Sequence, residues 1–513
     1  MRRNSLLTIC RAALLLSVAL PATPLLAQLP TSSGVAPLPR AESVINRSTD
    51  PYSGSVVQGK ATSEILDLTV VDALDRGLKY NLGLLLSSDT TAETRALRLQ
   101  SLSRLLPNIN GAFAEELQRL NLKAIGFKFA GFPSSVGPFG LTVLQATGVW
   151  EPLNASSIDS YRAAGQTVKA AEFNYQDARD TVVLTVGANY LLVIAQEARV
   201  EAIQAEVKTA EALYQLAKDQ EAAGLAPNID TLRARVQLQA QQQELIQAEN
   251  ELEKQRISLA RVIGLPVQQK YRLVNRVPYA PVPEIATQGA LDLALQTRSD
   301  YKAALAQVRA AELRKSAAWK QYLPSIGFSS TYGVLGYTPD SMAPNYNAAA
   351  SLNIPIFQGG RVQADVKEAE VALKTRQEQA DSLKGRIEQE VEDSILDLRA
   401  AARQVDVAKI GLELAQQTVD QSQDRFAAGV TNNVEVIQAQ QQLAAANDLY
   451  IASLFAHNIA KVLLARSIGN AEQIIKQYLA GNPALPPSVI NPDAQPPKPP
   501  DNPPTSPNPP QSK

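Results

Sequence analysis

Two short segments in the second half of the chain alternate apolar and polar residues with a period of two. In Ser325–Tyr337, one face of this pattern is apolar, and Tyr346–Phe357 repeats the arrangement after a polar loop. This period is typical of β-strands with one apolar face. The first half shows the same pattern less regularly at about 108–118 and 139–150. We therefore expect four strands, each long enough to cross a bilayer at a tilt.

Two soluble hairpins with one buried face would also fit this alternation. A single two-stranded hairpin is only marginally stable in water, which favours the membrane interpretation. Four strands cannot close a barrel, whose minimum is about eight strands. Unpaired strand edges cannot face lipid, so closure requires at least two chains.

Two very long segments rich in Ala, Gln and Glu contain no proline and predict helices over about Ala155–Ala222 and Arg361–Ala427. At 1.5 Å per residue, each helix spans roughly 100 Å. Both end at Ala-Ala-Gly, where Gly224 and Gly429 can adopt the left-handed conformation that terminates a helix. Each long helix is therefore expected to turn back at its glycine into an antiparallel helix.

The returning helices are expected over Ile229–Ile263 and Val434–Ile468, with Asn228 and Asn433 as possible N-caps. Shorter helices are expected over Leu82–Leu105 and Asp300–Leu323. A short helix and a returning helix together nearly match one long helix in length. The economical arrangement stacks these two end to end beside each long helix, which makes four helical columns per chain.

The two halves of the chain are similar to each other at a fixed offset of 205 positions. Asp219, Gly224, Asn228 and Gln237 correspond to Asp424, Gly429, Asn433 and Gln442. Such a register indicates an internal two-fold repeat, with one copy over 66–264 and the other over 285–470.

The ends of the chain have different compositions. Arg2 and Arg3 precede an apolar run that ends at Ala27, which predicts a cleaved signal peptide over 1–27. A membrane anchor is the alternative, but the run is short and broken by proline. Residues 28–65 are polar and predict an extended lead-in, and the proline-rich residues 481–513 predict a disordered tail.

Charge and cysteine content exclude several classes of protein. Without residues 1–27, the chain has 46 basic and 50 acidic residues, a net charge of −4, so nothing favours nucleic acid as a partner. The single cysteine, Cys10, lies in the signal peptide. The mature chain therefore has no disulfide, thiolate metal site or lipid-bearing cysteine. No transmembrane helix is expected after the signal peptide.

The repeat, the two Leu-Pro strand starts, the entry NIPIFQGGR (Asn353–Arg361) and the turn RFAAGVTNNVEVIQAQ (Arg425–Gln440) together resemble the TolC-like outer membrane efflux proteins. The resemblance covers about 66–470. It implies a mainly α protein with a β-barrel portion, in which a homotrimer forms a twelve-stranded outer-membrane barrel and a periplasmic α-barrel tunnel of coiled-coil helices. The implied partners are a periplasmic adaptor (membrane fusion) protein, an inner-membrane pump and outer-membrane lipid.

The resemblance also implies roles for residues at the helical tips. The turn and adaptor-docking residues would be Gly224, Leu225, Gly429 and Val430. TolC ties its tunnel shut with a tyrosine and an arginine where this chain has Phe426 and Thr431, and narrows its lumen with acids where this chain has Glu435 and Gln438. A further departure is the first strand-to-helix junction, where Glu151–Ser157 replaces the usual Gly-Gly turn.

Two acids at the tips have two possible roles. Asp230 and Glu435 both lie six residues past their glycines, in the first turn of a returning helix. An acid there complements the positive end of the helix dipole. Alternatively, both side chains line and charge the tunnel mouth.

Three other features give weak signals. Gly54–Lys60 fits a phosphate-loop pattern, but Ala61 replaces the required Ser or Thr. His457, the only histidine, is expected to be an ordinary packed helix residue. Trp150 fits either an aromatic belt or a cover over the helix junction.

The predicted function is a passive outer-membrane exit duct for small molecules or proteins, with no cofactor, metal or catalytic residue. Its localisation is the outer membrane with a periplasmic tunnel. A periplasmic helical scaffold or adaptor is the main alternative, and a secreted helical enzyme using carboxylates is a weaker one.

Overall fold

A computed structural model describes residues 50–124, 126, 131, 133–275, 285–469 and 471–479. The expected signal peptide (1–27), the first part of the lead-in and the proline-rich tail (481–513) lie outside these residues. The helices are α1 (Val70–Tyr80), α2 (Leu82–Ser103), α3 (Ala155–Ala222), α4 (Asn228–Val262), α5 (Thr287–Thr297), α6 (Ser299–Trp319), α7 (Arg361–Ala427), α8 (Asn433–Ser467) and α9 (Ala471–Leu479). The strands are β1 (Leu66–Leu68), β2 (Asn108–Asn121), β3 (Ser135–Leu153), β4 (Tyr271–Leu273), β5 (Ser325–Gly336) and β6 (Ala343–Asn353).

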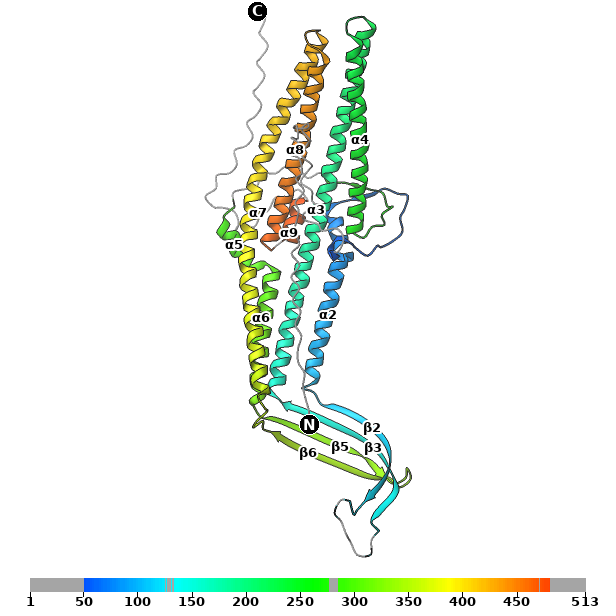
Figure 1. The fold of residues 1–513 in the computed structure, drawn as a ribbon, viewed down its shortest axis with the longest axis vertical. Coiled ribbons are helices and arrows are strands. Elements are labelled where there is room, and N and C mark those ends of the chain that lie inside the picture. The colour runs from blue at the N-terminus through cyan, green and yellow to red at the C-terminus, as the bar shows by residue number, and fades with distance from the viewer. Residues whose placement is uncertain are drawn as a thin grey trace, which may run out of the picture. The chain divides into compact units, whose positions relative to one another are not determined.

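The two long helices α3 and α7 organise the helical part of the chain (Figure 1). Helices α2 and α4 both pack along α3, and α6 and α8 both pack between α3 and α7. Both halves have the same element order, in which a short helix, two strands, a long helix and a returning helix follow one another. The bounds of α3 and α7 are those expected from the sequence, because neither segment contains a proline that would interrupt it.

The main hydrophobic core lies where the short and returning helices of each half meet. Its fully buried side chains include Leu74, Val182, Tyr190, Ile263 and Ile468. Helices α1 and α9 pack on α3 here, α5 packs on α7, and β1 pairs in parallel with β4. These small elements were not expected from the sequence, because each is too short to show a clear period. The sequence of α1 is amphipathic, with Val70, Ala73, Leu74 and Gly77 on its buried face. This pattern could have predicted the helix.

A group of arginine ion pairs ties the helices together near this core. Arg298, almost fully buried, contacts Asp300 at 2.7 Å and Glu390 on α7 at 2.6 Å. Arg466 on α8 pairs with Asp177 on α3. Because Arg298 is buried, removing either of its carboxylate partners would leave its charge poorly compensated, so its contacts help to fix α6 against α7.

The described part of the lead-in, from residue 50 on, makes defined contacts with the helices. Residues 51–53 form a short 3₁₀ helix, and backbone N–H groups of Ser55 and Gln58 donate to the carbonyls of Arg261 and Gly264 at 3.0 Å. This segment therefore packs on the end of α4. The phosphate-loop pattern of Gly54–Lys60 falls within it, and no strand precedes it in the described residues.

Strands β2, β3, β5 and β6 form one antiparallel sheet in the order β2-β3-β5-β6. The register places most of the large apolar residues of the four strands on one face, which carries Ile109, Phe113, Leu144, Trp150, Phe328, Tyr332, Val334, Tyr346 and Leu352. The opposite face is mainly polar and carries Asn110, Gln145, Thr147, Thr331, Asn345, Asn347 and Ser351, together with Val143, Val149 and Leu335. The outer edges of β2 and β6 have no strand partner among the described residues.

The strand bounds differ from those expected. The strands of the first half are longer than predicted, because β2 and β3 continue pairing to Asn121 and Ser135 after a bulge near Gln118. In the second half, β6 ends at Asn353 rather than near Phe357. Pro355 cannot donate to a strand partner, which explains this early end.

The helix caps also differ from expectation. Asn432, not Asn433, caps α8 by accepting from the Val434 N–H at 3.1 Å. Pro227 occupies the N-cap of α4 and makes no side-chain cap bond, while the Asn228 side chain donates to Glu221 at 2.7 Å. Asn228 and Asn433 are thus the first residues inside their helices, where a capping bond to the turn is no longer possible.

The two strand-to-helix junctions are built differently, as the sequence indicated. Asn154 caps α3 by accepting from the Ser157 N–H at 3.0 Å. At the start of α7, Gly359 and Gly360 both have positive φ. A side-chain cap in the first half therefore replaces the Gly-Gly turn of the second.

Two helices, α3 and α8, are long and apolar enough to cross a membrane by length and composition alone. More than half of the α3 window and half of the α8 window are buried within the chain. The core helix of a protein with no transmembrane helix passes the same test, so this observation is weak evidence for a membrane span.

Candidate functional site

The two helical tips are built from the same turn. Gly224 and Gly429 have φ values of +71° and +72°. The next residue in each turn closes a Schellman motif, with Leu225 N–H donating to Gln220 O at 2.8 Å and Val430 N–H donating to Arg425 O at 2.9 Å. Both glycines therefore supply the left-handed residue on which the reversal depends.

Each turn presents a large apolar side chain to solvent. Leu225 is 80% exposed and Val430 is 70% exposed. In Schellman motifs an apolar residue at this position frequently packs back onto the last helical turn. Exposed apolar side chains at equivalent positions of two tips are typical of a docking surface.

At the second tip, Glu435 has two partners within the chain. Its carboxylate is hydrogen-bonded by the Thr431 hydroxyl and lies 3.7 Å from Arg425 Nε, and its side chain is 39% exposed. Gln438 is exposed and lies three residues along the same helix, so the two side chains share a face. These residues form a polar, solvent-accessible group at the start of α8.

The structure places Asp230 differently from the expected tunnel lining. Asp230 is only 6% exposed, and its Oδ1 lies 3.5 Å from Nη1 of Arg233 on the same helix. Asn433, fully buried on α8, donates to the Asp230 carbonyl at 2.6 Å. A buried carboxylate cannot charge an aqueous lumen, so Asp230 fits the helix-dipole role in the first turn of α4.

The expected gate residue Phe426 is also buried, at 4% exposure. It belongs to a small tip cluster, whose other buried members are Leu213, Ala217, Ala234 and Val436. Because these residues come from α3, α4, α7 and α8, the cluster packs the two hairpins against each other. Phe426 therefore stabilises the tips within one chain and does not face solvent.

Sequence reasoning missed the link between the hairpins at Asn433 and the tip cluster. A partial signal was available for the cluster, since Leu213 and Ala217 lie four residues apart on α3 and therefore share a helix face. The Asn433 link had no such signal, because it joins residues 203 positions apart.

One further carboxyl group at the tips, that of Glu221, has a shifted pKa. Hydrogen bonds from Thr231 and Asn228 lower the pKa of the Glu221 carboxyl below its usual range. Both donors lie in the first turn of α4, so the shift reflects hydrogen bonds made across the tip to the last turn of α3.

The structure also shows where His457 and Trp150 lie. His457 is fully buried in α8, as predicted for a packed helix position. Trp150 Nε1 donates to the Leu105 carbonyl at 3.0 Å, and its ring lies 5.9 Å from that of Phe328. Trp150 therefore covers the junction after α2 while remaining on the apolar face of the sheet.

Comparison with known proteins shows which family shares this arrangement. The family described as "Outer membrane efflux protein" matches residues 104–265 and 290–470. The pyoverdine export outer membrane protein OpmQ of Pseudomonas aeruginosa is 27% identical over 73% of this chain and 80% of its own length. The solvent efflux pump outer membrane protein SrpC of Pseudomonas putida is 22% identical over 82% of this chain and 89% of its own.

Solved structures share the fold. The outer membrane channel CmeC of Campylobacter jejuni has a TM-score of 0.69 at 17% identity and covers 84% of this chain and 95% of its own. The outer-membrane channel OprN has a TM-score of 0.68 at 17% identity, over 78% and 90% of the two chains. With both halves matched and the helices and sheet in the same arrangement, the chain belongs to the outer membrane efflux protein family.

Proposed function

We propose that this protein is the passive exit duct of a tripartite efflux system in the outer membrane. The observation that carries this proposal is the four-stranded sheet, which has a mainly apolar face, a mainly polar face and two outer edges without a strand partner in the described part of the chain. An apolar face suits lipid and a polar face suits an aqueous lumen. The duct has no catalytic step and takes its energy from a partner pump.

The duct is a homotrimer with a barrel of twelve strands, four from each chain. Edge closure requires more than one copy, since lipid cannot satisfy the open edges of β2 and β6. The number three is what the resemblance to the TolC-like proteins implies. The matching element order of the two halves supports an internal duplication, 66–264 and 285–470, and the helices of three chains form the periplasmic tunnel.

The tips serve as the docking site and the gate. Leu225 and Val430, with the turns set by Gly224 and Gly429, form the apolar surface for a periplasmic adaptor. Glu435, Gln438 and Thr431 are the polar gate residues, because they are accessible at the start of α8. Asp230 and Phe426 support the tip from within and are not part of the gate.

The cargo is a small organic molecule, by analogy with the pyoverdine and solvent exporters among the relatives. Protein secretion is the alternative class. An inner-membrane pump and the adaptor supply selection and energy, while the duct supplies the path.

Fractionation and planar-bilayer recording test this function together. The protein should be found in the outer-membrane fraction and should conduct ions when reconstituted. A monomer recovered from the soluble periplasmic fraction, with no conductance, would instead identify a periplasmic scaffold.

The Glu435→Gln variant tests the gate assignment. It removes one negative charge per chain while keeping the side-chain shape, so block of the channel by divalent cations should weaken severalfold. Gln438→Glu is the matched variant, because it adds a charge on the same face and should strengthen the block. Unchanged cation block in both would leave Glu435 as a helix-dipole partner only.

A further inference from the structure

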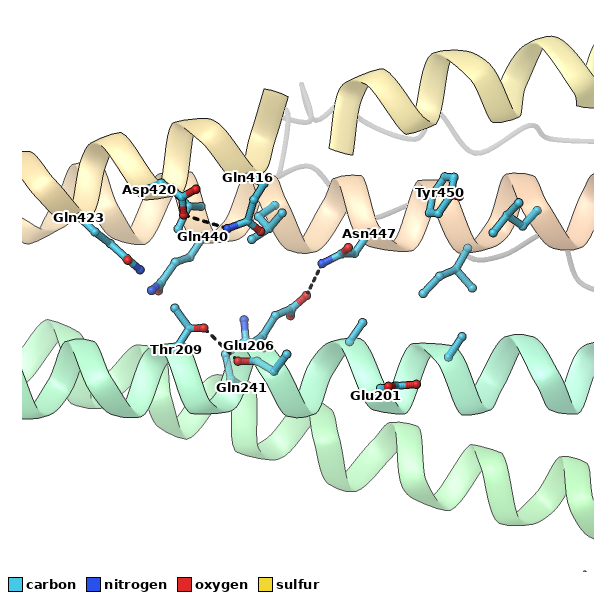
Figure 2. Close-up of a pocket in the computed structure, with 17 residues that line it drawn as sticks. Glu201, Glu206, Thr209, Gln241, Gln416, Asp420, Gln423, Gln440, Asn447 and Tyr450 are labelled. Carbon is cyan, nitrogen blue, oxygen red and sulfur yellow. Dashed lines mark hydrogen bonds between the residues drawn. The ribbon is translucent and has the colours of Figure 1, made fainter. Parts of the chain in front are cut away.

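A cavity of about 570 Å³ lies between the two helical hairpins, away from the tip turns. Figure 2 shows α3 and α4 on one side of this hairpin pocket and α7 and α8 on the other. On α3, Ala198, Ala202 and Ala205 line it at helical spacing, and their small side chains leave the space open. The volume is within the range of small-molecule sites.

Two buried side-chain amides in the pocket each have one atom without a hydrogen-bond partner in the described part of the chain. Gln241 on α4 is 7% exposed and Gln440 on α8 is 8% exposed. Neither Gln241 Oε1 nor Gln440 Nε2 has a hydrogen-bond partner among the described residues. A buried polar atom left unpaired costs about 1–3 kcal/mol, so such a pair is unusual unless something binds there.

The pocket is also acidic. Glu206 on α3 accepts a hydrogen bond from Asn447 on α8 at 3.4 Å, and Glu201 and Asp420 lie on the same walls (Figure 2). No lysine or arginine is among the described residues that line it. An organic ligand that satisfies these groups must therefore carry positive charge.

On balance, the surroundings of Glu206 oppose the ionisation of its carboxyl group. Burial raises its pKa to about 7, and the charges of Glu244 on α4 and Asp448 on α8 add to this effect. Arg199 on α3 and the Asn447 hydrogen bond act in the opposite direction. A cation bound beside Glu206 would relieve this unfavourable charge.

The unpartnered amides define the rest of the ligand. Gln241 Oε1 requires a donor and Gln440 Nε2 requires an acceptor. Hydroxyl groups meet both needs, since each can donate and accept. Val419 and Leu443 add apolar contact area for a carbon skeleton.

We infer that the hairpin pocket binds a small hydroxylated organic cation, such as an amino sugar or amino alcohol, and that the bound molecule bridges the two hairpins. The ammonium pairs with Glu206 on α3, and the hydroxyls pair with Gln241 on α4 and Gln440 on α8. Because these contacts join both hairpins, binding draws them together. This inference concerns a regulatory ligand and goes beyond the duct function.

Three probes separate the parts of this inference in titrations of the purified full chain. Glucosamine carries both charge and hydroxyls, glucose carries hydroxyls only, and butylamine carries charge only. Glucosamine should bind with a Kd of about 1 mM or tighter, and the other two at least tenfold more weakly. Phosphate buffer is required, because Tris is itself an amino alcohol.

Variants locate the site. Glu206→Gln should weaken glucosamine binding about tenfold, and Ala202→Leu should abolish it by filling the cavity while leaving every polar group in place. Glu211→Gln is the control, since Glu211 is exposed on the same helix and lies outside the pocket. Glucosamine binding that is equal in all three variants would overturn the inference and indicate general attraction to an acidic surface.

Two further measurements complete the test. Affinity should fall severalfold from pH 7.5 to 6, because Glu206 takes up a proton over this range, while the glucosamine amine, only partly protonated at pH 7.5, gains charge and offsets part of the loss. Spin labels at positions 225 and 430 should show a narrower distance distribution with glucosamine bound. No binding by wild type would refute the pocket as a ligand site, and binding without narrowing would refute the bridge between hairpins.

Discussion

At the scale of single residues, burial determines which acidic side chains at the tips can interact with solvent or ions and which can only complement the helix dipole. Asp230 and Glu435 occupy equivalent positions, but Asp230 is buried and Glu435 is accessible. Glu206 had no sequence signal at all, since it is one of many acids on a long helix. Its raised pKa arises from burial, with the charges of Glu244 on α4 and Asp448 on α8 adding to the effect.

The Glu206→Gln variant should stabilise the protein in a pH-dependent way. The folded-state pKa of about 7 lies above the ordinary value of 4.5, so the folded chain holds this proton more tightly. The cost of ionisation in the folded state therefore grows from about pH 4.5 and is complete above about pH 7. Glutamine never ionises, so the variant should gain about 1–2 kcal/mol at pH 8, discounted for partial exposure, and nothing at pH 4.

Thermal unfolding of wild type, Glu206→Gln and Glu211→Gln across this pH range measures the effect. The gain should appear only in Glu206→Gln and only at the higher pH. An equal change at both pH values would mean that Glu206 is not the titrating group.

At the scale of elements, each tip shows that a single residue with positive φ allows a long helix to reverse into the next one. The ideal Cβ positions of Gly224 and Gly429 meet no atom within 4 Å, so sterics with neighbours do not demand glycine there. Only the positive φ requires it. The consequence of a substitution is thus confined to the backbone of the turn.

Alanine substitutions at two glycines of the same helical hairpin should have opposite signs. Gly429→Ala should destabilise by about 1 kcal/mol, because alanine disfavours the left-handed region. Gly411→Ala, at an exposed helical position with equally open surroundings, should stabilise by about 0.5–1 kcal/mol. Chemical or thermal unfolding measures both, and Gly429→Val should cost more than Gly429→Ala. Two substitutions of the same sign would contradict the assigned turn.

At the scale of the whole molecule, the sheet is incomplete in one chain. β2 and β6 are its outer strands, separated by β3 and β5. Three strand spacings of about 4.8 Å place them roughly 14 Å apart, beyond the limit of about 7 Å between the Cα atoms of a disulfide. A disulfide between these strands can therefore form only between copies.

Cysteine pairs across the strand edges test the proposed trimer. Asn110→Cys on β2 should be combined in turn with cysteine at Asn345, Asn347 or Ala349 on β6, all on the polar face. At least one pair should give a covalent trimer under oxidising conditions, while each single variant stays monomeric on a denaturing gel. Covalent species larger than a trimer, or none in any pair, would refute three-fold closure.

The sequence alone determined the long helices, the four strands, the tip glycines and the family resemblance. Each of these follows from local order, because a period of two or 3.6 residues, a proline or a glycine acts within a few positions. The bounds of α3 and α7 and the sheet's apolar residues were readable for this reason. The small elements α1, α5, α9, β1 and β4 were not, since each depends on the core for its stability.

Only the tertiary structure decided which tip residues are buried, where Asn433 links the hairpins and that four separate strands align most of their large apolar residues on one face. It also created the hairpin pocket, whose lining residues span positions 198 to 454. These features depend on contacts between helices and strands hundreds of residues apart. The physical reason is that burial and pKa are properties of packed surroundings, which no local pattern in the sequence specifies.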